Sequence, residues 1–279
     1  MKVQKYGPIA LLLFTVLFLG GCDFALFAPE GEIGQNIRDT IFITVGLMLL
    51  VVIPTLCLIV WVALKYRKGN NADYEPEWEH SNKIEMWAWG VPIVIIAILA
   101  TITYFASYSM DPRRPIESKK ETMTIQVVAL EWKWLFIYPE QGIATINEIA
   151  VPVDTPVEFL ITSNDSMNSF YIPRLGGQLY AMAGMENRLH LIANQKGVYR
   201  GISSNYSGFG FSGMRFKVHS VADEEFAQWV AKVKTSPKKL DMTSYKQLEK
   251  RTKDNPVEYF GHIDPLQFKN IIEKFKGVQ

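Results

Sequence analysis

The side chains that could do redox or metal chemistry are few in this chain of 279 residues. Both cysteines, Cys22 and Cys57, lie in apolar runs, and residues 58–279 hold none. This excludes a disulfide framework and any cysteine-rich zinc or iron–sulfur site. After residue 121 the imidazoles are His190, His219 and His262. They are widely spaced, and a lone histidine in a strand is more often a packed or surface residue than a metal ligand.

Cys22 lies where exported bacterial proteins receive a lipid. Lys2 and Lys5 precede an apolar core at residues 9–19, and two glycines come before the cysteine. This pattern is typical of a secretory signal peptide, which has a basic N-terminus, a short apolar core and small residues before the cleavage site. The core rises about 16 Å as a helix, which is too short to span a bilayer. Residues 19–22 resemble a lipobox, so we expect cleavage after residue 21 and a lipidated Cys22 heading an outer segment, 22–40. The alternative is an ordinary cleaved signal.

Glu85 lies at the edge of a long apolar run. A carboxylate at that depth can collect a proton from water and pass it inward. The alternative is a solvated carboxylate at a helix start, which the helix dipole stabilises. The residue type and position alone favour the second interpretation.

Two apolar runs must place these groups relative to a membrane. Ile41–Leu64 and Met86–Met110 contain no Asp, Glu, Lys, Arg or His, so each gains several kcal/mol on insertion, at about −0.3 to −0.6 kcal/mol per central apolar residue. They predict a transmembrane helical hairpin over residues 41–110, with a loop at 65–85. If the N-terminus is exported, the basic cluster at 65–68 lies in the cytoplasm, as the positive-inside rule requires. Everything after Met110 is then on the outer side.

The composition narrows the class of protein further. There are 29 Lys+Arg against 28 Asp+Glu, a net charge of +1. A protein that binds nucleic acid through a large basic excess is therefore not expected.

Residues 122–220 have the pattern of an all-β sandwich. Short runs of β-forming residues are separated by proline and glycine, without intervening helices. The predicted strands are Thr122–Leu130, Trp132–Tyr138, Val157–Thr162, Arg188–Ala193, Val198–Ile202 and Met214–His219. Residues 221–279 read as a helical extension, with Asp223 as an N-cap. Further helices are predicted at Asp241–Lys253 and Pro265–Lys276.

A two-helix hairpin followed by an outer sandwich is similar to subunit II of the haem–copper respiratory oxidases. In the cytochrome c oxidase branch, that sandwich is a cupredoxin with a two-copper centre, and its ligand loop reads Gly-x-Cys-Ser-Glu-x-Cys-Gly-x-x-His-x-x-Met. Residues 201–214 keep this spacing, both glycines and the methionine. The positions aligned with the ligands are Asn168 and Phe211 for the histidines, Ser203 and Ser207 for the thiolates, Asn205 for the glutamate, and Met214.

The chemistry of those side chains argues against a copper centre. Copper electron-transfer sites need a thiolate, which favours Cu(I), and a serine hydroxyl is a hard ligand with a pKa far above neutral. We therefore expect a cupredoxin-like domain without metal or other cofactor. Asn205 also removes a carboxylate from the acidic surface that docks cytochrome c in the copper-bearing branch. Cytochrome c is therefore not expected as a partner.

Residues 134–148 and 168–185 closely resemble subunit II of the cytochrome bo-type ubiquinol oxidases, and the resemblance covers nearly the whole chain. It implies a lipoprotein subunit of a proton-pumping ubiquinol oxidase in the bacterial inner membrane. The haems, the copper and the ubiquinol pocket would belong to subunit I, with which this chain and smaller membrane subunits assemble. This chain would then be structural, with no catalytic residue of its own.

The resemblance also bears on three individual residues. Residues 80–87 are similar to the family's segment at the mouth of a proton-uptake channel, which favours proton uptake for Glu85. Trp132 and Trp134 are predicted to share a strand face. In copper-bearing relatives the first of these takes electrons from cytochrome c. Without copper behind it, packing or contact with subunit I is expected.

Two other functions remain open from the sequence. One is a cytochrome c oxidase subunit II with an atypical metal site. The other is a stand-alone membrane lipoprotein with a binding sandwich.

Overall fold

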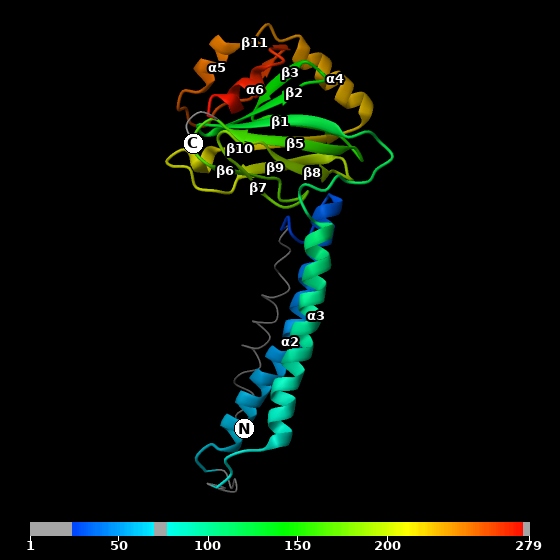
Figure 1. Cartoon of the computed structure of the whole chain (residues 1–279), viewed down its shortest axis with the longest axis vertical. Helices are drawn as coiled ribbons and strands as arrows, with labels where there is room; N and C mark the ends of the chain where they lie inside the picture. Colours follow the sequence, from blue (N-terminus) through cyan, green and yellow to red (C-terminus); the bar gives the residue numbers. More distant parts are fainter. Residues whose placement is uncertain (1–23, 70–76, 276–279) are drawn as a thin grey trace, which may run out of the picture.

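The computed structural model describes residues 24–69 and 77–275. The predicted signal segment and Cys22 lie outside these ranges. Two long antiparallel helices form a hairpin, and one end of the hairpin carries a β-rich domain with short helices on its far side (Figure 1).

The hairpin consists of α2 (Glu32–Lys65) and α3 (Asn82–Ser109). Both helices are long and apolar enough to cross a membrane by length and composition. They contain the first predicted span and all of the second except Met110, and they begin at Glu32 and Asn82 rather than at Ile41 and Met86. The earlier start has a physical reason, because a helix continues into polar sequence wherever its backbone hydrogen bonds can continue. The additional turns of α2 reach the β-rich domain.

The β-rich domain is a sandwich of two sheets, which confirms the predicted fold class. The first sheet has the order β12 (Glu258–Phe260), β3 (Ile143–Ile146), β2 (Lys133–Tyr138), β1 (Met123–Leu130), β5 (Pro156–Ser163), β8 (Asn187–Ile192). The second has the order β4 (Glu148–Pro152), β10 (Arg215–Val221), β9 (Gly197–Ser203), β6 (Asn168–Tyr171), β7 (Leu179–Ala181). Strands β1 and β5 pair in parallel, as do β4 and β10.

Aromatic rings fill the space between the two sheets. Phe170 and Phe216 stack with ring centroids 5.2 Å apart, and Trp134 meets Phe170 edge-on at 5.4 Å. All three side chains are buried. Large rings in offset or edge-on contact contribute packing energy beyond the area that they bury.

A second apolar cluster covers the opposite face of the first sheet. Its members come from β1, β2, β3 and the C-terminal extension, and include Leu135, Ile146, Tyr245, Phe268 and Ile271. Strand β2 is consequently buried on both faces over its whole length. The domain therefore has three layers: two sheets and a covering layer made by the chain after residue 238.

The C-terminal extension is less helical than predicted. It contains α4 (Asp223–Lys234), α5 (Met242–Leu248) and α6 (Gln267–Glu273), together with β11 (Lys239–Leu240), β12 and β13 (His262–Ile263). Strand β12 adds to the edge of the first sheet.

The first residue of α4 does not have its predicted role. Asp223 is not the N-cap, because that position is Ala222, whose backbone N–H donates to Glu225 Oε2 at 2.7 Å. The Asp223 carboxylate instead binds Lys120.

Two connections fix the sandwich to the hairpin. On one side, the backbone N–H of Glu30 donates to the Arg174 carbonyl at 2.7 Å, and the Arg174 guanidinium lies 3.1 Å from the Glu30 carboxylate. A Cβ on Gly31 would lie 2.3 Å from the Ile192 carbonyl oxygen, so only glycine permits this close packing.

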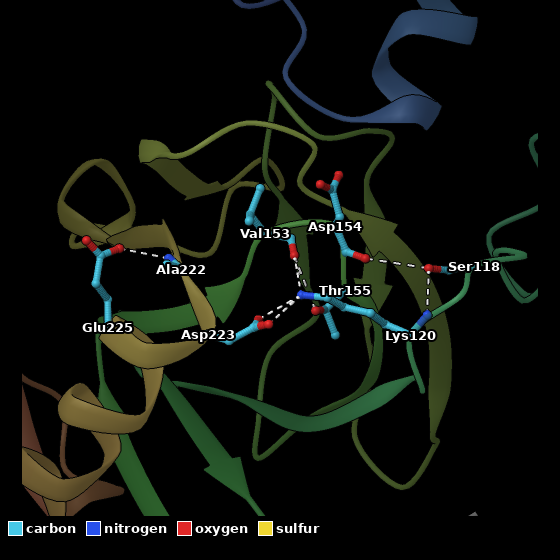
Figure 2. Close-up of polar contacts among 8 residues, drawn as sticks. All are labelled: Ser118, Lys120, Val153, Asp154, Thr155, Ala222, Asp223 and Glu225. Carbon is cyan, nitrogen blue, oxygen red and sulfur yellow. Dashed lines mark hydrogen bonds and ion pairs between the residues drawn. The ribbon is translucent and has the colours of Figure 1, made fainter.

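The other connection lies after α3, in the linker that leads into β1. Lys120 Nζ is 2.7 Å from the Asp223 carboxylate and donates to the Val153 carbonyl at 3.1 Å (Figure 2). Nearby, Ser118 Oγ contacts the Asp154 carbonyl at 3.5 Å. The linker is thereby bound both to the β4–β5 turn and to the start of α4.

Candidate functional site

The six positions aligned with copper ligands gather at one end of the second sheet. Asn168 begins β6 and Ser203 ends β9. Ser207 and a short 3-10 helix that begins at Phe211 lie in the loop between β9 and β10, and Met214 lies just before β10. The backbone holds the loop closed, since the N–H of Ser203 donates to the Met214 carbonyl at 3.1 Å.

A buried hydrogen bond joins two of these positions. Ser203 Oγ donates to Asn168 Oδ1 at 3.0 Å, and both side chains are almost fully buried. Asn168 Nδ2 in turn donates to the Ser166 carbonyl at 3.0 Å. The Asn205 amide donates to the Met167 carbonyl at 3.0 Å, which ties the loop to the segment before β6. The polar side chains of Ser203, Asn168 and Asn205 therefore form hydrogen bonds with each other or with nearby backbone carbonyls.

Trp132 packs against the same loop from the turn between β1 and β2. Its indole Nε1 donates to the Ser207 carbonyl at 3.0 Å. A Cβ on Gly210 would come within 2.2 Å of the indole ring, so this position must be glycine while the ring lies there. The Ser207 hydroxyl itself is buried and has no hydrogen-bond partner among the described residues.

Trp132 and Trp134 do not share a strand face, so that prediction was wrong. Trp132 has φ +59° and lies in the tight turn before β2, whereas Trp134 lies within β2 and is fully buried. A left-handed residue in the turn breaks the alternation on which the prediction depended. The packing role of Trp134 is therefore inside the domain. Contact of Trp132 with another subunit remains a prediction.

The residues on either side of Trp132 bind the C-terminal extension. Glu131 is buried and its carboxylate lies 3.1 Å from Arg251 Nε. Burial raises the pKa of the Glu131 carboxyl, a hydrogen bond with Asp165 adds to the rise, and the Arg251 charge opposes it. Lys133 Nζ donates to the Lys250 carbonyl at 3.0 Å, and burial lowers the pKa of its ammonium group. The β1–β2 turn thus joins the loop at residues 204–214 to the extension.

These side chains do not fit a two-copper centre. Hydroxyl, amide, phenyl and thioether groups occupy the aligned positions, and none supplies the thiolate or imidazole that such a centre needs. Within residues 24–69 and 77–275, no group of three His, Cys, Asp or Glu side chains could hold a metal ion.

The three outer histidines lie apart and serve other contacts. His190, in β8, has Nδ1 3.0 Å from the Pro112 carbonyl in the linker after α3. His219, in β10, lies 3.4 Å from the Glu148 carboxylate. His262 is exposed in β13.

Glu85 lies in the first turn of α3, at the end of the hairpin remote from the sandwich (Figure 1). Its side chain is exposed in the single chain. The position agrees with both interpretations made from the sequence, a helix-start carboxylate and a proton-collecting group. Cys22 lies outside the described residues, so its lipidation remains a prediction.

Sequence reasoning missed the contacts that hold this end of the domain together. The ion pair between Glu131 and Arg251 joins residues 120 positions apart, and nothing in either local sequence indicates it. The contact between Trp132 and the loop had one available signal, Gly210, a glycine at a variable position of the ligand motif.

Two family descriptions match the chain. "Cytochrome C oxidase subunit II, periplasmic domain" matches residues 139–221, and "COX Aromatic Rich Motif" matches residues 234–277. The second match spans α5, β12, β13 and α6. Helices α5 and α6 belong to the layer that covers the first sheet, and β12 forms the edge of that sheet.

Relatives match over nearly the full length. The chain is 52% identical to cytochrome bo(3) ubiquinol oxidase subunit 2 of Pseudomonas aeruginosa, over 98% of this chain and 84% of that protein. It is 49% identical to ubiquinol oxidase subunit 2 of Acetobacter aceti, over 99% of this chain and 92% of that protein. The crystal structure of the periplasmic domain of cytochrome oxidase subunit II from Bradyrhizobium japonicum covers 48% of this chain and 99% of its own, with 23% identity and a TM-score of 0.40. From the full-length relatives, the chain belongs to the family of subunit 2 of the cytochrome bo(3)-type ubiquinol oxidases.

Proposed function

We propose that this chain is a non-redox subunit of a complex that oxidises ubiquinol and reduces oxygen to water. The observation that carries the proposal is the Ser203–Asn168 hydrogen bond, in which two positions aligned with copper ligands bind each other. The names of the full-length relatives supply the substrate. Electrons would pass from ubiquinol to haems and copper in subunit I and would bypass this chain.

The purified complex provides the test, through its electron donor and its copper content. Ubiquinol should drive oxygen uptake, and reduced cytochrome c should not. Replacing both serines, Ser203→Ala with Ser207→Ala, should leave the copper per haem and the ubiquinol-driven rate unchanged, because neither hydroxyl holds a metal. A loss of copper in this variant, or uptake driven by cytochrome c, would support a cytochrome c oxidase subunit with an atypical metal site instead.

The proposed partner is subunit I, together with smaller membrane subunits in the bacterial inner membrane. The hairpin supports this, since most of its apolar side chains are exposed in the single chain and need lipid or other helices around them. Gentle solubilisation should therefore yield this chain with a haem protein. Purification of the chain alone, from membranes where haem protein is abundant, would support the stand-alone lipoprotein.

We further propose that Glu85 helps to collect protons for the complex on the cytoplasmic side. Its exposure at the remote end of the hairpin supports access to water. Glu85→Gln should slow turnover without loss of assembly, whereas Glu79→Gln, an exposed carboxyl in the preceding loop, should not. Equal turnover of Glu85→Gln and the unmodified complex would leave Glu85 as a solvated helix-start carboxylate.

Lipidation of Cys22 belongs to the same proposal. Mass spectrometry of the mature N-terminus should find the chain beginning at a modified Cys22, with residues 1–21 removed. An unmodified N-terminus at any other residue would contradict it.

A further inference from the structure

A polar pocket lies between the start of β2 and the C-terminal extension. Its volume is about 440 Å³, within the range of small-ligand sites. Lys133 lines it from β2, and the other lining residues belong to β11, α5, β12 and the neighbouring loops. Helix α5 and strand β11 lie on the side of the sandwich remote from the hairpin (Figure 1). The elements around the pocket are therefore away from lipid, and its ligand would come from water.

Lys133 brings a buried positive charge to this pocket. The residue is only 3% exposed, and lysine is rarely buried to that extent without a paired carboxylate. Among the described residues, however, Lys133 forms no ion pair within 4.0 Å. The carboxylate of Glu131 lies 3.1 Å from Arg251, and that of Glu258 lies 2.7 Å from Lys238. Each of these two carboxylates is therefore bound to another cation.

The hydrogen bonds of the Lys133 ammonium group go to neutral acceptors. Nζ donates to the Lys250 carbonyl at 3.0 Å and to the Thr252 hydroxyl. An ammonium group has three donors, so one is left without an acceptor among the described residues. The charges of Glu258 and Glu131 raise the pKa of Lys133, but burial lowers the pKa by more. The buried end of the pocket therefore lacks negative charge.

The exposed side chains of the pocket add to this positive charge. Lys238 and Lys239 line it together with Lys133, and among the described lining residues only Glu258 is acidic. Three ammonium groups against one carboxylate leave an excess of positive charge. Gln247 lines the same pocket and offers amide N–H donors. A dianion with several oxygen acceptors matches these groups in charge and in hydrogen bonding.

We propose that this pocket binds a soluble phosphate, either the inorganic ion or the phosphate group of a small phosphomonoester, with Lys133 at its buried end. A phosphate group near neutral pH carries about 1.5 to 2 negative charges and has strong acceptor oxygens. Lysine binds phosphate as a point charge. A carboxylate has a single charge and leaves part of the excess unmatched. The bound anion contacts β2 on one side and the extension on the other, and so stabilises the extension on the first sheet.

Hydrogen–deuterium exchange of the whole membrane complex tests this site, with inorganic phosphate as the probe and sodium chloride of equal ionic strength as the reference. Phosphate should slow exchange in peptides from residues 239–260, by about tenfold at ten times its Kd, because a ligand stabilises the state that binds it. Peptides from the centre of α2 should not respond. Equal slowing by chloride, or no slowing by phosphate, would overturn the proposal.

Three variants then assign the binding to Lys133. Lys133→Met removes the charge, keeps an unbranched side chain, and should weaken phosphate binding by about tenfold or more. Lys246→Gln is the matched control and should bind as tightly as the unmodified complex, since Lys246 is an exposed lysine of α5 that does not line the pocket. Equal binding by these two variants would refute the assignment.

Glu258→Gln gives a result of the opposite sign and does not require the fold to tolerate loss of Lys133. It removes the acidic group of the pocket and should tighten phosphate binding by about fivefold, as expected for one repulsive charge about 4 Å away in water. Weaker binding in Glu258→Gln would contradict the proposal.

The source of the phosphate is distinguished by titrating inorganic phosphate and glycerol 3-phosphate in parallel. Tighter binding of glycerol 3-phosphate would identify the ligand as a phosphomonoester, and tighter binding of inorganic phosphate would identify it as the free ion. Failure of both to bind would exclude a phosphate site.

Discussion

The Ser203–Asn168 hydrogen bond makes a sharp test of the idea that the former ligand positions now act only as scaffolding. In Ser203→Ala, Asn168 Oδ1 loses its donor while it remains buried beside β9. An unsatisfied buried acceptor costs about 1–3 kcal/mol. Local opening of β6 and β9 should therefore become about 5- to 150-fold more frequent.

Hydrogen–deuterium exchange of peptides from β6 and β9, measured in the assembled complex, reports that opening directly. Ser207→Ala is the matched control, because the Ser207 hydroxyl is buried without a partner and its removal leaves nothing unsatisfied. Exchange in Ser207→Ala should stay the same or become slower. The ubiquinol-driven rate should be unchanged in both variants, because the proposed function gives neither group a part in electron transfer.

Two results would refute this reasoning. If Ser207→Ala accelerated exchange as much as Ser203→Ala, the hydrogen-bond assignment would be wrong. If Ser203→Ala stopped turnover in a complex that still assembled, the site would have a functional role beyond structure.

Three further changes test other contacts. Gly210→Ala places a methyl group against the Trp132 ring and should destabilise the β1–β2 turn by about 1–3 kcal/mol, measured as faster amide exchange there. Arg174→Gln should cost about 1.5–3 kcal/mol through loss of the charged contact with Glu30, with exchange increasing in residues 28–35 and not in the hairpin centre. The pKa of Asp241 is lowered by the hydrogen bond from the Ser244 backbone, so its contribution to α5 is present above its unfolded pKa and is lost as pH falls through the lower folded value. Asp241→Asn caps the helix without titrating, and its α5 should show no such acid loss on circular dichroism or exchange.

The broad architecture could be predicted from the sequence because it depends on composition over long stretches. Charge-free runs of more than twenty residues identified the hairpin, and runs of β-forming residues identified six strands correctly in type. Strands β3, β4, β6 and β7 were missed, because segments of three to five residues carry too little periodicity to be recognised. Strand β2 is buried on both faces, so its sequence does not alternate and gives no indication of what covers its second side.

The site was predictable where it depended on residue identity and unpredictable where it depended on geometry. The alignment with the ligand loop identified positions that gather at one end of the sandwich. The left-handed conformation of Trp132 was not foreseeable, because a bulky residue with positive φ is uncommon and tertiary contacts impose it. Similarly, α5 ends at Leu248 rather than Lys253 because the following residues bind Glu131 and Lys133 across the sheet.

The two attachments between hairpin and sandwich have a consequence for assembly. One precedes α2, through Glu30 and Arg174, and the other follows α3, through Lys120 and Asp223. Because the sandwich is attached at both of these points, it has little freedom to rotate relative to the hairpin about the membrane normal. The conformational entropy of fixing that orientation is lost when this chain folds, and not when it meets its neighbours. The sandwich should therefore already have a fixed orientation relative to the hairpin before assembly. The surfaces of the hairpin and of the sandwich should then bind the neighbouring subunits in one step.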